Sequence, residues 1–151
     1  MRLPHLSYLL AGGLLATACT SSKVPPARPA PQLSQISPGL AKYAPSGLAS
    51  IQILAQGENA FVGLLKMAPG GAVPEHRDAT EEYIHILKGS GTIYINDKPH
   101  PTEPGTTVYM PAGAKVRYQN GAQELVALQV FAGPQPAAKY NSWVEGHERD
   151  K

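Results

Sequence analysis

The chain has 151 residues, with 15 Gly, 15 Pro, and 13 Lys and Arg against 11 Asp and Glu. This length favours one domain, and so much Gly and Pro is typical of many turns or of a disordered segment. The formal net charge of +2 provides no basic stripe, so we expect no nucleic-acid partner. The single cysteine, Cys19, excludes a disulfide within the chain.

Residues 1–18 have the three parts of an export signal. Arg2 gives a positive start, residues 6–15 form a short apolar run, and small residues precede Cys19. This arrangement is typical of a secretory signal peptide. The run is too short for a spanning helix, which needs about 20 apolar residues. We therefore predict a signal peptide over residues 1–18.

The sequence Ala16-Thr17-Ala18-Cys19 resembles the lipobox of bacterial lipoproteins, in which the cysteine becomes the first mature residue and is acylated. The resemblance implies lipidation of Cys19, and several acyl chains hold a protein stably on a membrane. Thr20 follows the cysteine where an Asp would favour the inner membrane. The implied location is the cell envelope, on the outer membrane and facing the periplasm.

Two segments flank the predicted folded domain. Residues 19–48 are rich in Pro, Ala and Ser, cannot bury enough apolar surface to offset the entropy of ordering, and are predicted to be a disordered, extended linker. Residues 134–151 are mostly polar and are predicted to be a tail that docks through Trp143.

Residues 49–133 contain short β-prone runs separated by turn residues, and no segment has a helical period. Such a pattern predicts an all-β sandwich or barrel. The predicted strands are 51–55, 60–67, 83–88, 92–96, 107–110, 115–119 and 124–131.

Two motifs within this region resemble the two signatures of the cupin superfamily. In residues 69–91 the family expects Gly, His-x-His, Glu and Gly. This chain has His76, then Asp78 in place of the second His, then Glu82 and Gly89. We expect Gly89 to be a turn residue with a positive φ.

The second motif, in residues 105–120, is Gly, Pro-x-Gly, His and Asn in the family. Here Gly105, Pro111, Gly113 and Asn120 fit, and Val116 stands in the His position. The resemblance implies a double-stranded β-helix, which is a jelly-roll barrel.

The resemblance also implies a site in the mouth of the barrel. It places His76, Asp78 and Glu82 there as candidate metal ligands, and Val116 and Tyr118 as pocket residues. One imidazole and two carboxylates suit a divalent ion such as Fe, Mn, Ni or Zn. However, Val116 removes a ligand, and an apolar side chain suits a metal-free pocket with a polar His–carboxylate network equally well.

Several functions remain open from the sequence. The leading hypothesis is an exported, lipid-anchored cupin domain that binds a small-molecule ligand, with or without a divalent metal. A second is a metal-dependent enzyme of dioxygenase or isomerase type, and a third is a non-catalytic interaction module of the envelope. Whether the protein is an enzyme is left undecided.

A further expectation concerns the strand face that carries Tyr83, His85 and Leu87, opposite to Glu82. This face is too apolar for bare solvent. We predict that either the strand at 51–55 or a second subunit, in a homodimer, covers it.

Overall fold

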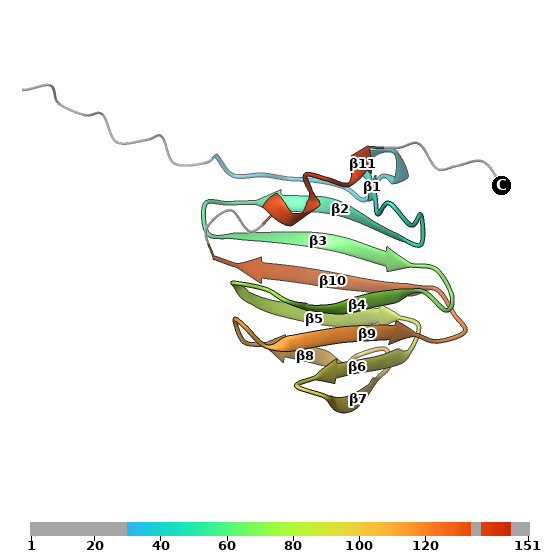
Figure 1. Ribbon diagram of the computed structural model, residues 1–151. Coiled ribbons are helices and arrows are strands. Elements are labelled where there is room, and N and C mark those ends of the chain that lie inside the picture. Colours follow the sequence, from blue (N-terminus) through green and yellow to red (C-terminus); the bar gives the residue numbers. More distant parts are fainter. Residues whose placement is uncertain (1–29, 134–136, 146–151) are drawn as a thin grey trace, which may run out of the picture.

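The computed structural model describes residues 30–133 and 137–145 (Figure 1). The predicted signal peptide, Cys19 and the first part of the predicted linker lie outside these residues. Neither of the two 3-10 helices in the described chain, η1 (Pro38–Leu40) and η2 (Ala138–Tyr140), has the length or apolar character needed to cross a membrane.

Two antiparallel sheets face each other as layers, with β4, β9, β6 and β7 in front of the larger sheet in Figure 1. In spatial order the larger sheet contains β11 (Val144–Glu145), β1 (Lys42–Tyr43), β2 (Ala49–Gln56), β3 (Ala60–Met67), β10 (Leu125–Ala132), β5 (Glu81–Lys88) and β8 (Thr107–Met110). The smaller sheet contains β4 (Ala72–Arg77), β9 (Lys115–Asn120), β6 (Gly91–Ile95) and β7 (Lys98–Thr102). The predicted all-β jelly-roll barrel is confirmed.

Alternation along the strands places the apolar side chains between the layers. In β10, Leu125, Ala127, Gln129 and Phe131 are buried while the residues between them are half-buried. The buried residues form two clusters, one inside the barrel and one beneath the C-terminal segment around Phe61.

The turn residues behave as expected. Gly89 has a φ of 83°, and a Cβ there would lie 2.4 Å from the carbonyl oxygen of Glu124. Gly113 has a φ of 77°. Asn120, the last residue of the second motif, donates its amide to the carbonyls of Ala68 and Gln123 and thereby ties a loop to the sheet.

Within residues 49–133, two strands were not among the predicted runs, and proline explains both. β4 contains Pro74, and β7 contains Pro99 and Pro101. Both are edge strands of the smaller sheet, where a residue without an N–H is tolerated. His100, between Pro99 and Pro101, is therefore an exposed residue on an edge strand.

The folded unit extends beyond the predicted bounds of 49–133. Part of the predicted linker forms β1, and part of the predicted tail forms β11, and the two pair with each other at one edge of the larger sheet (Figure 1). Two-residue strands carry almost no hydrophobic pattern, so the sequence gives little sign of them.

The N-terminal segment before β1 also lies along the sheet. The Gln32 side chain donates to the carbonyl of Gln56 and accepts from its N–H, at 2.7 and 2.9 Å. The Gln52 side chain accepts from the N–H of Ser37 at 2.9 Å and donates to the carbonyl of Gln35 at 2.8 Å. Side-chain amides therefore hold this segment beside the part of β2 that β1 does not reach.

Candidate functional site

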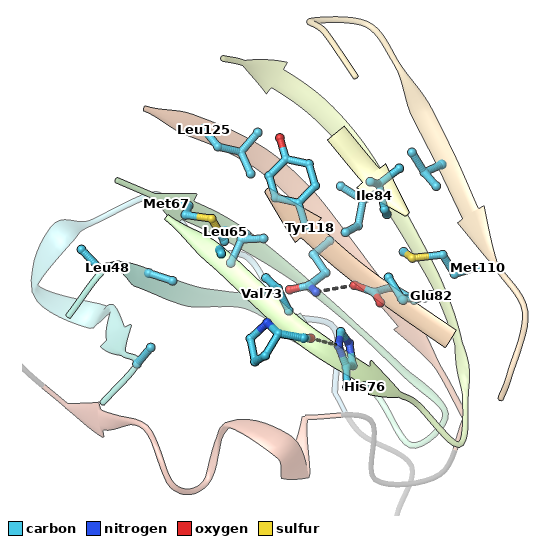
Figure 2. A pocket seen from close by; sticks show the side chains of 18 of the residues that line it. Leu48, Leu65, Met67, Val73, His76, Glu82, Ile84, Met110, Tyr118 and Leu125 are labelled. Carbon is cyan, nitrogen blue, oxygen red and sulfur yellow. Dashed lines mark hydrogen bonds between the residues drawn. The ribbon is translucent and has the colours of Figure 1, made fainter. Parts of the chain in front are cut away.

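A cavity of about 330 Å³ lies between the two sheets (Figure 2). Most of its wall is apolar, and polar groups gather at two places. His76, Glu82 and Gln129 lie together toward one end, and Thr102 and Tyr118 form a separate hydroxyl pair. The main apolar lining residues labelled in Figure 2 are Leu65, Met67, Val73, Ile84, Met110 and Leu125.

His76, at the end of β4, has a fixed ring orientation. Its Nδ1 lies 2.9 Å from the carbonyl oxygen of Pro74, and because a carbonyl can only accept, Nδ1 carries a proton. Nε2 then lies 3.3 Å from Oδ2 of Asp78. The hydrogen bond to this carboxylate raises the pKa of His76 more than burial lowers it. Nε2 is thus the atom that either holds the second proton or offers a lone pair to an ion.

Asp78 follows β4 and is bound from two sides. Lys139, on η2, donates to its two carboxylate oxygens at 3.0 and 2.9 Å, and the His76 ring approaches Oδ2. Burial works to raise the pKa of Asp78, but the hydrogen bonds from His76 and Lys139 outweigh it and hold the pKa below its ordinary value. Asp78 is therefore an anion over the neutral pH range.

Glu82, on β5, is the most deeply buried of the three, with 4% of its surface exposed. Gln129 donates to Glu82 Oε1, as the dashed line in Figure 2 shows, and Tyr140 donates its hydroxyl to Gln129 Oε1 at 2.6 Å. Burial raises the pKa of Glu82, and the Gln129 hydrogen bond only partly offsets it. The chain Tyr140–Gln129–Glu82 fixes this carboxyl at the cavity wall.

The structure brings together the three predicted ligand residues. One ligand atom each from His76, Asp78 and Glu82 lie within 4.8 Å of one another. An imidazole whose other nitrogen donates to a carbonyl is the usual arrangement at metal sites. In their residue types and in the ring orientation, these side chains fit a divalent ion.

The two predicted pocket residues also line the cavity. Val116 is the cross-strand partner of His76, so an apolar side chain adjoins the cluster. Tyr118 points into the cavity (Figure 2), and its hydroxyl lies 3.4 Å from Thr102 Oγ1. Gly91 leaves room for it, because a Cβ there would lie 2.2 Å from that hydroxyl.

The outer face of β5 takes no part in this site. His85 bonds Thr107 Oγ1 at 2.8 Å, which agrees with its predicted place opposite Glu82. Tyr83 and Leu87 are 40% and 46% exposed. The prediction that β2 covers this face is wrong, because β2 lies in the same sheet as β5, beyond β3 and β10. Cover by a second subunit stays a prediction.

Three residues that support the His76, Asp78 and Glu82 cluster escaped the sequence analysis, namely Gln129, Lys139 and Tyr140, and so did Thr102 in the hydroxyl pair. One signal was available for Gln129, which is polar at an inward position of a strand otherwise apolar on that side. Tyr140 is an aromatic in a polar tail, and in the structure it is buried against Phe61. Nothing in the sequence marks Lys139.

The fold and the site together define a class: a double-stranded β-helix with a histidine and two carboxyl groups at one end of its cavity. The family model described as "Cupin domain" matches residues 63–131. Residues 63–131 are therefore a cupin domain.

The chain is also similar to curated proteins. Protein SchB from Streptomyces halstedii is 27% identical over 75 residues, which are 49% of this chain and 54% of SchB. Auxin-binding protein T92 from Nicotiana tabacum is 29% identical over 164 residues, covering 97% of this chain and 87% of T92. The chain thus spans about half of the first relative and most of the second.

Among solved structures, KdgF from Halomonas sp. superposes with a TM-score of 0.64. The match covers 72% of this chain and 98% of that protein, at 10% sequence identity. At this identity the likeness shows the fold alone.

Proposed function

We propose that this protein is an exported, lipid-anchored cupin domain that binds a small, largely apolar molecule, with a divalent metal ion at His76, Asp78 and Glu82. The observation that carries the proposal is the apolar cavity of about 330 Å³ with these three side chains gathered near one end. A cavity of this size with a few convergent polar groups is typical of small-molecule sites.

The chemistry of the cavity suggests a ligand with two polar ends. Tyr118 and Thr102 are buried, and their mutual hydrogen bond uses only one of two hydroxyl protons. The other proton is available for an acceptor on a ligand. The opposite polar group of the ligand would lie at the His76–Glu82 end, with an apolar body between. The similarity to an auxin-binding protein supports a small organic ligand.

A metal ion would contribute in one way. Bound by one imidazole and two carboxylates, it would act as a Lewis acid toward a ligand oxygen. His76 would offer Nε2, and the Tyr140–Gln129 chain would keep Glu82 in place.

The location and the assembly are parts of the same proposal. Cys19 would carry the lipid, and the domain would face the periplasm from the outer membrane. The exposed face of Tyr83, Leu87 and Tyr109 supports a homodimer, because exposed apolar groups that gather on one face commonly mark partner sites.

One observation favours the enzyme alternative. Glu82 is a buried carboxyl at the cavity wall with a raised pKa, and such groups serve as general acids or bases. A metal-dependent cupin enzyme is therefore the second candidate, and turnover of a bound compound would distinguish it from a binding protein.

The test uses untagged full-length protein purified without added metal. Elemental analysis reports the ion, and thermal shift with small phenols, aromatic carboxylates, hydroxy acids and sugars reports the ligand. Val108→Trp should fill the cavity that Val108 lines and abolish binding. Leu87→Trp, on the outer face, is the matched control. If no compound binds, or if Val108→Trp binds as well as the parent, the cavity is not the ligand site.

A further inference from the structure

A cation of the protein itself already occupies the carboxylate cluster. Lys139 Nζ lies 2.9–3.0 Å from the Asp78 oxygens and 3.9 Å from the centroid of the Phe131 ring. Contacts with a carboxylate and an aromatic face both favour a positive charge. The cluster is thus partly neutralised without any ion.

A divalent ion needs the same oxygens. To bind His76 Nε2 and Glu82 together with Asp78, it must take at least one of the two Asp78 oxygens that Lys139 holds. It would also lie close to the ammonium, and like charges repel, although the partial exposure of Asp78 (24%) and Lys139 (32%) means that water weakens this repulsion. The ammonium and the metal ion therefore compete for Asp78.

Lys139 is joined to the edge of the cavity. It lies on η2, beside Tyr140, and both residues line the cavity with Trp143. The rings of Tyr140 and Trp143 contact edge to face at a centroid distance of 4.9 Å. Displacement of Lys139 would remove one of the links that hold this segment to the barrel. Others are the hydrogen bond from Tyr140 to Gln129 and the packing of Tyr140 against Phe61.

We propose that Lys139 is the resident cation of the site, that a divalent ion binds only by displacing it from Asp78, and that the displacement shifts the segment of Tyr140 and Trp143 at the cavity wall. This inference rests on the proposed metal site. It makes Lys139 a residue that sets metal affinity and couples the ion to the cavity wall.

The test measures binding of Zn²⁺ alone to untagged full-length protein by calorimetry. Lys139→Met keeps the length and apolar stem of the side chain and removes the charge, so Zn²⁺ affinity should rise by at least about tenfold, the scale of outer-shell changes at metal sites. Lys88→Met is the matched control. Lys88 pairs with Glu124 at the far end of β5 and should leave the affinity unchanged. Lys139→Arg keeps the positive charge and should not raise the Zn²⁺ affinity.

The second readout is fluorescence, because Trp143 is the only tryptophan of the chain. Zn²⁺ should change the emission of Trp143 in the parent and in Lys88→Met. The change should be much smaller in Lys139→Met, which already lacks the ion pair with Asp78. If Lys139→Met does not fold, Lys139→Gln provides the same neutral comparison.

Different results would overturn the inference on Lys139 and the proposed metal site. If the parent binds Zn²⁺ and Lys139→Met binds it equally or more weakly, or if Trp143 emission does not respond in the parent, the inference on Lys139 is overturned and the proposed metal site stands. If neither protein binds Zn²⁺, both the metal site and the inference fail.

Discussion

Tyr140→Phe tests the hydrogen-bonded chain that ends on Glu82. The substitution keeps the ring, and with it the contacts to Phe61 and Trp143 at centroid distances of 5.7 and 4.9 Å. It removes only the hydroxyl, which donates to Gln129 Oε1 at 2.6 Å. Gln129 is 5% exposed, so its oxygen loses its hydrogen-bond donor in a place that water does not easily reach.

The expected cost follows from that burial. A buried acceptor left without a donor costs about 1–3 kcal/mol. For a folded domain of this size, each kcal/mol lowers the melting temperature by roughly 4 °C, so we expect a fall of about 4–12 °C by calorimetry. Tyr109→Phe is the control, because the Tyr109 hydroxyl bonds Glu81 at 3.1 Å on the exposed face. Loss of the Tyr109 hydroxyl should lower the free energy of unfolding by less than about 0.5 kcal/mol. Equal effects of the two substitutions would refute the reasoning.

Three further substitutions probe the site and the anchor. Val116→His places an imidazole opposite His76. Calorimetry should show Ni²⁺ or Zn²⁺ affinity raised at least about tenfold, since imidazole is a good ligand for both ions. A lower melting temperature that added metal does not restore would count against a metal site. Burial raises the pKa of Glu82 in the folded protein above the ordinary value of 4.5, so the parent loses folding stability as the pH rises from 4.5 through the raised pKa. Glu82→Gln does not titrate and should therefore be increasingly more stable than the metal-free parent over this range. Melting temperatures of the two proteins that run parallel from pH 4 to 8 would contradict this. Cys19→Ser should move the protein from membranes to the soluble fraction, and a variant that still sediments with carbonate-washed membranes would exclude the lipid anchor.

The barrel could be predicted from the sequence because characteristic turn residues separate its strands. Gly89 and Gly113 mark positive-φ turns, and the apolar runs between such turns match the observed strands. The two edge strands with prolines were missed as runs, since hydrophobic pattern and β propensity both decline there. His76, Asp78 and Glu82 could be grouped because all three belong to the first motif, which the cupin resemblance places at the mouth of the barrel.

The remaining part of the site could not be predicted for a different reason. Lys139 and Tyr140 reach the cluster from a 3-10 helix of three residues, far along the chain from Asp78 and Glu82. No periodicity links such a segment to a particular strand. Its position depends on tertiary contacts, namely the packing of Tyr140 against Phe61 and its hydrogen bond to Gln129.

The glutamine contacts beside β2 bear on how this protein can be shortened for experiments. A chain cut at Pro45 would lose Gln32, Gln35 and Ser37 together with β1. The outer-edge N–H and C=O groups of β2 that β1 and Gln32 now bind would then be bare, and uncovered strand edges pair with other copies and aggregate. Light scattering on such a fragment would report an association created by the truncation. The oligomeric state is better measured on a chain that begins before Gln32.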